Sequence, residues 1–362
     1  MYEGHDAIDA VHDSLMRQQV QCAQLGSSLY AIALEALSQD YVRGGTTFEL
    51  LNGVSEKPVH DALPLRLLGG LHAIALSGID TRLSGQFPST GGAPTNDLAD
   101  IVLTALQEHR EHLSASVRRN VQTNEVGRSI VALSIARWLP TIGAQTCRWF
   151  EVGASAGLNL NFPRFHASTG VTAMGDETSS VSFGPDWFDS SPPHGQSAIC
   201  VDLRGCDPFP IDVSRPSERL RLLSFVWPDQ SARLDRLRRA IDIALEYPPR
   251  VDRAEAGPWL ASFDASPRHD GEATVVYHSI VWQYLSPDNR QSLIRSLEHL
   301  ASKSTPRRPV VWARMEPAGD MADIRVNIWT GDMTPVQLEL GRVGYHGPTL
   351  RWSPRRLHPS DA

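Results

Sequence analysis

The segment WFEVGASAGLNLN, at residues 149–161, constrains the fold more than any other part of the chain. A short apolar run ends at the acid Glu151. Three small residues, Gly153, Ser155 and Gly157, then occupy alternate positions before a helix-compatible Leu-Asn-Leu. Glycine tolerates positive φ and has no Cβ, so the backbone can turn tightly and approach a ligand closely. The pattern predicts a strand, a nucleotide-binding loop and a helix whose amino end points into the same crevice.

The spacing of this loop distinguishes between cofactors. It reads E-x-G-x-S-x-G-x-N, which fits the dinucleotide fingerprint G-x-G-x-x-G poorly. The Glu151 carboxylate would repel a pyrophosphate but suits a cofactor that carries a cation. S-adenosylmethionine has a sulfonium and an amino group, and the segment resembles the acid-x-Gly-x-Gly-x-Gly loop of its methyltransferases. A turn of small residues that only packs a helix on a strand is the alternative. The expected cofactor contacts are Glu151, Gly153, Ala154, Ser155, Gly157 and Asn159.

Composition restricts the class of protein. The chain has 362 residues, of which 41% are hydrophobic and 21% charged, as in ordinary globular proteins. Its formal charge of −7, from 34 basic and 41 acidic residues, argues against nucleic acid as a partner, because phosphate binding needs a basic face. We find no targeting segment, no apolar run of about 18 residues and no C-x-x-C pair among the four cysteines. We therefore expect a cytoplasmic protein with reduced thiols, a small-molecule substrate and no membrane partner, while the oligomeric state stays open.

The pattern of apolar residues divides the chain into two parts. Residues 1–145 read as helical, with apolar positions at helical spacing over 8–38 and again from 96 to 138, where we expect a break near Asn120. We interpret this part as a helical cap or substrate region. Residues 146–362 alternate strands with helices, which predicts a parallel sheet covered by helices on both faces, in a methyltransferase-like nucleotide-binding domain.

Strands are expected in the second part wherever apolar residues are dense. They are CRWFEV, ICVDLRGCD, a short segment at 250–256, ATVVYHSI and PVVWARME, with a helix over 287–302. DIRVNIWTG and VQLELGRVGYHG alternate apolar and polar residues, as antiparallel strands open to water on one side do. The segment 166–196 reads as a loop. The predicted fold class is α/β: a Rossmann-like class I methyltransferase sheet, mostly parallel with antiparallel final strands, and an N-terminal all-helical region.

Acidic residues follow the second and third expected strands. Ligands of parallel sheets bind outside the carboxyl ends of the strands, near the point where the strand order reverses. Asp207 follows the second strand, and a carboxylate can accept hydrogen bonds from both hydroxyls of a ribose. Asp202 and Asp212 are alternatives, and a helix cap or turn is the structural reading of Asp207. Glu255, or Asp252 in its place, is the candidate contact for the adenine amino group.

The fourth strand is followed by the candidate catalytic residues. Methyl transfer requires alignment of the reacting atoms and, for a hydroxyl or a protonated amine, a base. His278 ends the strand, and an imidazole titrates near neutral pH. We expect it to face the crevice and to act with Tyr284. A buried structural imidazole is the alternative.

The motif QTNEVGR precedes the sheet and supplies the candidate substrate-binding residues. They are Asn124, Glu125 and Arg128, whose guanidinium could pair with a ligand carboxylate, and a Glu-Arg pair on a helix is the alternative. His109 and His112 lie one helical turn apart, as two metal ligands would. Since no further ligands are close in the sequence, we expect a solvated helix face and no metal.

Six motifs together resemble one family. They are QTNEVGRS (122–129), EVGASAGLNL (151–160), VDLRGCDPFPIDV (201–213), FVWPDQSARLDRL (225–237), VVYHSIVWQYL (275–285) and HGPTLRW (346–352). Over most of its length the chain is similar to an uncharacterised bacterial family, a domain of unknown function. The resemblance implies an S-adenosylmethionine-dependent methyltransferase-like fold but no particular methyl acceptor. The family pattern has an Asp-Arg-aromatic run after the loop, where this chain has Pro163-Arg164-Phe165, which puts a contact from that acid in doubt.

The combined prediction is an S-adenosylmethionine-dependent methyltransferase that acts on a small molecule. Two alternatives stay open. One is a non-catalytic module that binds S-adenosylmethionine or its product S-adenosylhomocysteine. The other is an NAD(P)-dependent oxidoreductase, which the loop spacing disfavours.

Overall fold

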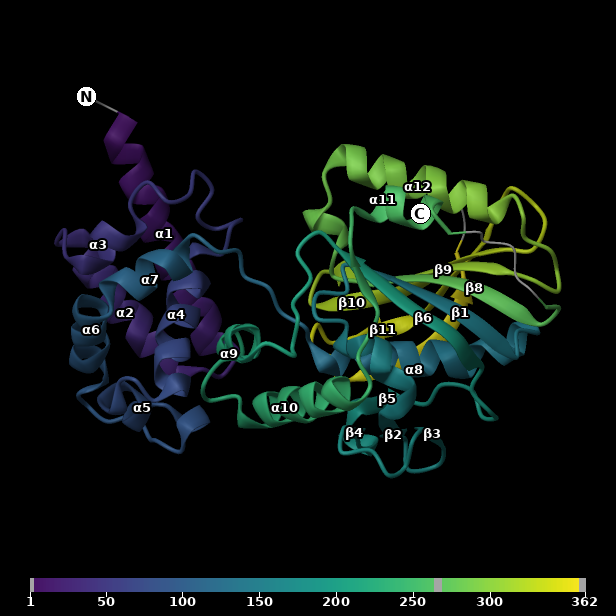
Figure 1. Ribbon diagram of the computed structural model, residues 1–362, viewed down its shortest axis with the longest axis horizontal. Helices are drawn as coiled ribbons and strands as arrows, with labels where there is room; N and C mark the ends of the chain where they lie inside the picture. Colours follow the sequence, from purple (N-terminus) through teal and green to yellow (C-terminus); the bar gives the residue numbers. More distant parts are fainter. Residues whose placement is uncertain (1–2, 264–268, 358–362) are drawn as a thin grey trace. The chain divides into compact units, whose positions relative to one another are not determined.

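The computed structural model describes residues 3–263 and 269–357, which form two compact units (Figure 1). Each unit is built from two separate stretches of the chain. The first comprises Met1–Thr123 and Ser214–Arg238, and the second comprises Asn124–Val213 and Arg239–Ala362. The last division falls inside helix α10 (Ser231–Glu246). Within the described part of the chain, no helix combines the length and the apolar character needed to cross a bilayer.

The first unit consists of helices around an apolar core. Its elements are α1 (Glu3–Gln24), α2 (Ser28–Val42), α3 (Thr46–Leu51), α4 (Leu63–Ser77), α5 (Thr81–Gln86), η1 (Pro88–Thr90), α6 (Leu98–Glu108), α7 (Arg110–Val117) and α9 (Pro216–Ser224). The periodic segment 8–38 divides into α1 and α2, because Gly26 adopts a φ of 85° and the Ser27 hydroxyl caps α2 by accepting the Tyr30 N–H. Trp227, from the second stretch of this unit, packs against the core.

The second unit contains a nine-stranded sheet of order β5-β12-β11-β10-β9-β8-β1-β6-β7. The strands are β1 (Thr146–Val152), β5 (Phe188–Ser190), β6 (Ile199–Asp207), β7 (Val251–Arg253), β8 (Glu272–Ser279), β9 (Val310–Ala318), β10 (Met321–Trp329), β11 (Val336–Val343) and β12 (Leu350–Arg356). Neighbouring strands are parallel from β7 to β9 and antiparallel from β9 to β12. A mixed α/β fold with a large, mostly parallel sheet is therefore confirmed.

The strand order reverses at β1, which lies between β6 and β8. The chain continues from β1 to β6 and β7 on one side, and later to β8 and β9 on the other. Glu151 of β1 is in register with Gly205 of β6 and Tyr277 of β8, so the carboxyl ends of these strands meet at one edge. In Figure 1, α8 (Ser129–Trp138) lies on one face of the sheet, and α11 (Ala256–Ala261) and α12 (Pro287–Ala301) lie on the other. The break expected near Asn120 precedes α8, since α7 ends at Val117.

Two segments of this unit differ from the prediction. The chain after the glycine-rich loop forms the 3-10 helix η4 (Leu158–Arg164) with Pro163 inside it, so the expected α-helix amino end at the loop is absent there. The segment 166–196, predicted as a loop, contains β5 and a small sheet of order β3-β2-β4. The strands of that sheet are β2 (His166–Ser168), β3 (Ala173–Gly175) and β4 (Ser182–Phe183). The remaining 3-10 helices are η2 (Val126–Arg128), η3 (Leu139–Ile142), η5 (Pro185–Trp187) and η6 (Trp282–Tyr284).

Candidate functional site

The glycine-rich loop after β1 has three residues in the left-handed region. Gly153, Ser155 and Gly157 have φ values of 71°, 55° and 70°. The glycines adopt this conformation without strain, whereas it is uncommon for serine. Added Cβ atoms at the two glycines would lie 2.5 Å from side-chain carbons of Val281 and Val251, respectively. Both glycines are therefore required by the loop's own conformation and by its contact with neighbouring chain.

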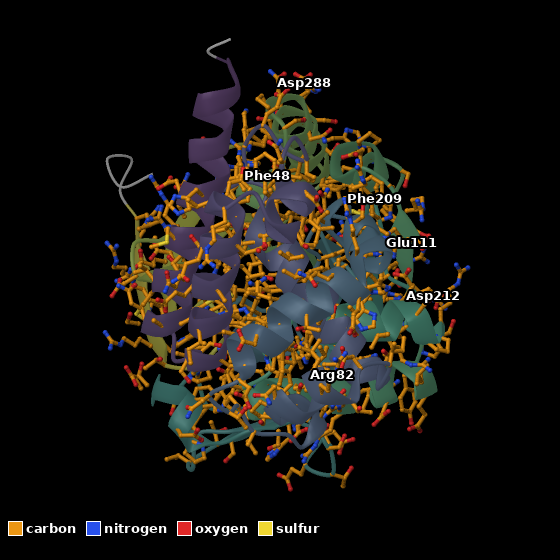
Figure 2. The ribbon with its side chains drawn as sticks, turned by 90° about the vertical axis from the view of Figure 1, so that its left-hand side faces the viewer. Phe48, Arg82, Glu111, Phe209, Asp212 and Asp288 are labelled. Carbon is orange, nitrogen blue, oxygen red and sulfur yellow. The ribbon has the colours of Figure 1, made fainter. Side chains whose placement is uncertain are left out.

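Asp207 holds this loop against the end of β6. Its Oδ2 accepts the Ser155 N–H at 2.9 Å, and its Oδ1 accepts the Phe209 N–H at 2.8 Å. The Gly153 and Ala154 N–H groups both donate to the Cys206 carbonyl. Phe209, labelled in Figure 2, follows this turn and is 66% exposed. Asp207 thus anchors the turn and the loop, and a contact between its carboxylate and a ribose stays a prediction.

The QTNEVGR motif lies directly against the loop. The Asn124 side-chain oxygen accepts the Leu158 N–H at 3.0 Å, and the Asn159 amide donates to the Glu125 carbonyl at 3.2 Å. The Ser129 hydroxyl donates to Asn159 Oδ1 at 2.8 Å. Glu125 caps η2 by accepting the Gly127 N–H at 3.0 Å. These contacts within the protein were not foreseen, and a role of Asn124 or Glu125 in binding a substrate stays a prediction.

Arg128 joins the same region to the HGPTLRW motif. Its Nε donates to the Tyr345 carbonyl at 3.1 Å, and its Nη1 donates to the Ser279 carbonyl at 3.3 Å. A Cβ at Gly127 would lie 2.0 Å from the His346 oxygen, so the two backbones touch at that glycine. Five of the six motifs that carry the family resemblance therefore meet around the end of β1.

Glu151 is buried beside the loop with 4% of its surface exposed. Burial raises the pKa of this carboxyl to about 8, because a charged group is poorly solvated there, and the Arg128 charge opposes the rise only in part. Within the described residues, the Ser155 hydroxyl and the Trp149 indole N–H are buried without hydrogen-bond partners. Buried polar groups are seldom left unpaired, so this cluster could offer hydrogen bonds to a polar ligand.

Tyr277 belongs to this cluster, and the sequence analysis gave it no role. It is in register with Glu151, and its ring lies 5.1 Å from that of Trp149, between centroids. Burial and the charge of Glu151 raise the pKa of its phenol. Ser279 lies close to the hydroxyl and opposes this rise, but no contact of the hydroxyl meets hydrogen-bond geometry. In a strand with no polar alternation, sequence alone could not tell whether Tyr277 or His278 faces Glu151.

His278 points to the opposite face of the sheet from Tyr277, which corrects the expectation that it faces the crevice. Its side chain is fully buried, and its Nδ1 lies 2.6 Å from Glu316 Oε1. The ring lies 5.8 Å from the Trp282 ring and nearly parallel to it. Since a carboxylate only accepts hydrogen bonds, Nδ1 carries the proton, and Nε2 is buried without a partner among the described residues.

Glu316 is the partner that the sequence analysis missed. It lies near the end of β9 and also accepts the N–H groups of Val281 and Trp282, at 3.1 and 3.3 Å. Burial alone would raise its pKa, but the His278 contact and these two N–H groups together lower it. Its position after the strand segment PVVWARM was the only available signal.

The other candidates of the carboxyl edge lie at the surface. Tyr284, in η6, is 66% exposed. Glu255 is exposed and accepts a hydrogen bond from the Asn289 amide at 2.7 Å, while Asp252 accepts the Trp259 indole N–H at 2.8 Å. The His278 and Tyr284 side chains thus have very different environments. Their joint catalytic role stays a prediction.

Pro163 and Arg164, where the resemblance implied an acid followed by an arginine, belong to contacts within the protein. Pro163 lies inside η4, and the Arg164 guanidinium stacks 3.6 Å from the centre of the Tyr247 ring. The Asn161 amide donates to the Tyr247 carbonyl at 3.1 Å. Together these contacts join η4 to the chain just after α10.

A separate polar cluster lies in the helical unit. One ligand atom from each of Asp80, Glu108 and His109 falls within 4.8 Å of the others, a spacing that could hold a metal ion. Arg82, however, contacts both carboxylates, and Asp80 Oδ1 caps α5 through two backbone N–H groups. The cluster is therefore an ion-pair network, and His109 pairs with Asp80 at 3.2 Å where a solvated face was expected.

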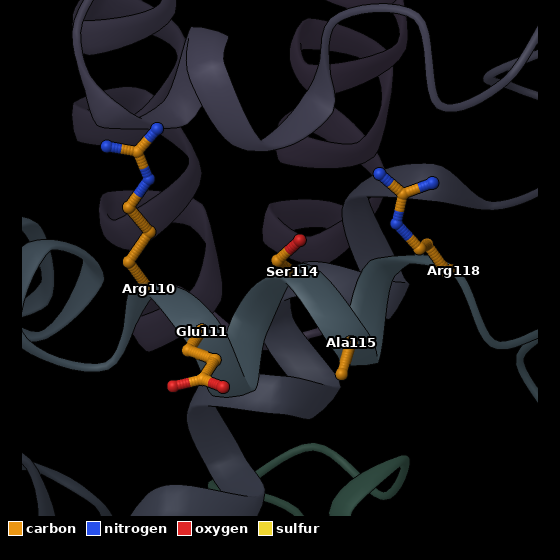
Figure 3. Close-up of a pocket in the computed structure, with 5 residues that line it drawn as sticks. All are labelled: Arg110, Glu111, Ser114, Ala115 and Arg118. Atoms are coloured by element: carbon orange, nitrogen blue, oxygen red, sulfur yellow. The ribbon is translucent and has the colours of Figure 1, made fainter.

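An open hollow also follows the surface of α7. It is lined by Arg110, Glu111, Ser114, Ala115 and Arg118 (Figure 3). Arg110 and Arg118 extend to one side of the helix and Glu111 to the other, and Arg110 pairs with Glu49 at 2.9 Å. A hollow formed by one helix with a paired arginine offers no convergent set of polar groups.

A comparison with known protein families identifies the family of this chain. The model of the family described as "Uncharacterized protein conserved in bacteria (DUF2332)" matches residues 12–352. The chain belongs to this family. The match confirms the resemblance carried by the six motifs, five of which meet around the end of β1. Among curated proteins and solved structures, nothing matches this member of the family.

Proposed function

We propose that this protein binds S-adenosylmethionine at the glycine-rich loop and transfers a methyl group to a small molecule. The arrangement of the sheet supports the proposal. The parallel strands β7-β6-β1-β8-β9 reverse their order at β1, and the antiparallel strands follow at one side, as expected for a Rossmann-like methyltransferase sheet. Ligands of such sheets bind at the carboxyl edge near the reversal, which is where Glu151 and its loop lie.

The environment of the Glu151 carboxyl group is the observation that carries the proposal. Within the described residues its carboxyl group has no hydrogen bond or ion pair, and its pKa is about 8. A cation placed beside it would favour the carboxylate and so gain an ion pair in a poorly solvated position. A pyrophosphate there would face an acid, and the loop N–H groups of Gly153, Ala154 and Ser155 already donate within the protein.

The residues present fit the cofactor's polar groups. Glu151 could accept from its amino group, and the Ser155 hydroxyl, unpartnered among the described residues, could bond its polar atoms. The Asp207 carboxylate is the proposed acceptor for its ribose hydroxyls. S-adenosylmethionine, when bound, supplies an activated methyl group, so the protein's main task is alignment of the acceptor. The Tyr277 hydroxyl, in register with Glu151, is the group we propose to position that acceptor.

Titration calorimetry with S-adenosylmethionine and S-adenosylhomocysteine tests the proposal. Because ionisation of Glu151 accompanies binding of the cation, binding of S-adenosylmethionine near neutral pH should release a proton, which is seen when buffers of different ionisation enthalpy are compared. Glu151→Gln should weaken binding about tenfold or more and abolish the proton release. Glu298→Gln, an exposed change on α12, is the matched control and should alter neither. No binding of either ligand at millimolar concentration would refute the proposal.

A non-catalytic binding module is the second candidate. The observation that favours it is the environment of the predicted catalytic pair, since His278 is fully buried against Glu316 and Tyr284 is 66% exposed. This candidate predicts that S-adenosylhomocysteine binds but that no methyl group passes from labelled S-adenosylmethionine to any fraction of cell metabolites.

A further inference from the structure

A pair of cysteines lies at the opposite end of β1 from the glycine-rich loop. Cys147 and Cys200 are register partners in the neighbouring strands β1 and β6, and their Sγ atoms are 3.5 Å apart. Both are free thiols in the structure. Neighbouring strands are spaced about 4.8 Å apart, which lies within the Cα separations that disulfides span. The two sulfurs therefore already face one another at a position where a covalent bond could form.

The two thiols differ in their access to solvent. Cys147 is fully buried, whereas Cys200 is partly exposed. Strand β7 pairs with β6 only at Gly205–Asp207, and Ile199 and Val201, on either side of Cys200, are 67% and 54% exposed. The pairing of β1 with β6 also shifts directly after Cys147, so the backbone is irregular at this point. A small reagent can reach Cys200, and the second thiol lies directly behind it.

We propose that Cys147 and Cys200 form a reversible disulfide between β1 and β6 when the protein meets a hydroperoxide. The Cys200 sulfur attacks the terminal peroxide oxygen and the O–O bond breaks. The departing oxygen takes the Cys200 thiol proton and leaves as water or an alcohol. The sulfenic acid so formed on Cys200 is attacked by the Cys147 sulfur. The S–O bond then breaks, and the departing hydroxide takes the thiol proton as water. The thiols lose two electrons, the peroxide gains two, and a dithiol reverses the reaction.

The cross-link would join the two strands that carry the glycine-rich loop and its anchor. Glu151 follows Cys147 in β1, and Asp207 ends the strand that contains Cys200. The bond itself lies away from both, so it would fix the register of β1 and β6 without covering the loop. The proposal is independent of any ligand at that loop.

Peptide mapping of the full-length protein after treatment with hydrogen peroxide tests this proposal. Trypsin places each cysteine in its own peptide, with Cys147 in 138–148 and Cys200 in 165–204. The expected product is one species that joins these two peptides with the loss of two hydrogens and separates on reduction. Reactive thiols measured in denaturant should fall from four to two. Sulfinic or sulfonic acid on Cys200 without the joined peptide would overturn the proposal. No reaction at either thiol would overturn it too.

Single variants locate the bond. Cys147→Ser and Cys200→Ser should each abolish the joined peptide, and Cys147→Ser should leave an unresolved sulfenic acid on Cys200 that a dimedone probe labels. Cys206→Ser, a change at a buried cysteine of the same strand, should leave the cross-link intact. A joined peptide that contains Cys206 or Cys22 in the wild-type protein would also contradict the assignment.

Discussion

Glu151, which is buried, and Glu316, which is partly buried, are two acids of one sheet whose pKa values shift in opposite directions. Burial raises the pKa of Glu151 to about 8. Burial acts on Glu316 in the same sense, but the His278 contact and two backbone N–H groups lower its pKa overall. At Glu316 hydrogen-bond donors outweigh the effect of burial, whereas Glu151 is more deeply buried and has no hydrogen bond to a described residue. The difference also separates the two faces of the sheet: one holds an acid with three hydrogen-bond donors, and the other holds an acid without a hydrogen bond to any described residue.

The largest expected effect is the pH dependence of stability caused by Glu151. Its pKa rises from 4.5 to about 8 on folding, so the folded state keeps a proton that the unfolded state loses. The free energy of unfolding should fall as the pH rises through that window, by up to about 5 kcal/mol. Glu151→Gln should flatten this slope and be more stable than the wild type above pH 8. Urea unfolding followed by tryptophan fluorescence measures it, and equal slopes for both proteins would break the comparison.

His72, in the helical unit, tests the same rule for a base. Burial lowers its pKa from 6.5 to about 4, although its contact with the Ser224 carbonyl opposes this. The unfolded chain therefore binds a proton that the folded state excludes, and stability should fall by about 3 kcal/mol as the pH drops through this window. His72→Gln should remove most of that dependence. Hydrogen exchange of the α4 amides, measured by mass spectrometry at pH 6.5 and about pH 4, checks this prediction. If the variant keeps the same pH dependence of stability, another group is responsible for it.

Near neutral pH, we expect Glu316→Gln to lower the free energy of unfolding, whereas Glu151→Gln should raise it. The substitution removes the charge from an acceptor of three hydrogen bonds and should lower the free energy of unfolding by about 2 kcal/mol. Urea unfolding at one neutral pH compares both variants directly, with Glu298→Gln as the exposed control. Stabilisation by both substitutions would mean that the donors around Glu316 do not offset its burial.

The smallest expected effect concerns Ser155. Its φ of 55° is costly for a side chain with a Cβ, and its hydroxyl is buried without a partner in the described structure. Ser155→Gly should raise the unfolding free energy by about 1 kcal/mol while it weakens binding of S-adenosylmethionine, because the hydroxyl is lost. Thermal unfolding and calorimetry of the same variant give both values. A more stable variant with unchanged binding would remove Ser155 from the proposed contacts.

Sequence predicted the strands that form the middle of the sheet because their apolar runs are long. The segments CRWFEV, ATVVYHSI and PVVWARME correspond to β1, β8 and β9, and the glycines of the loop have the positive φ that was expected. The short strands within 166–196 were missed, since two or three residues carry no readable period. The 3-10 conformation of η4 was also missed, although Pro163 is a visible obstacle to an α-helix.

The candidate site was less predictable than the fold. Every residue of β8 is buried, so its sequence has no alternation to show which side chains share a face. Tyr277 was therefore overlooked beside His278. The bond between His278 and Glu316 joins residues 38 positions apart in neighbouring strands, and only the sheet register brings them together. Asp207 was selected correctly as a strand-end acid, but its bond to the Ser155 N–H depends on the shape of the loop.

Because the helical unit is built from two separate stretches of chain, it cannot fold completely until the second stretch has been synthesised. Residues 1–123 leave the ribosome long before 214–238, which supply α9, the Trp227 ring and the carbonyl that His72 contacts. Strands β1 and β6 are synthesised between these two stretches. Part of the core of the nascent helical unit thus stays uncovered while the first stretch of the second unit is translated. The helical unit therefore cannot finish folding from residues 1–123 alone. A chaperone that binds during this interval would contact the surfaces of α2 and α4 that the second stretch later covers.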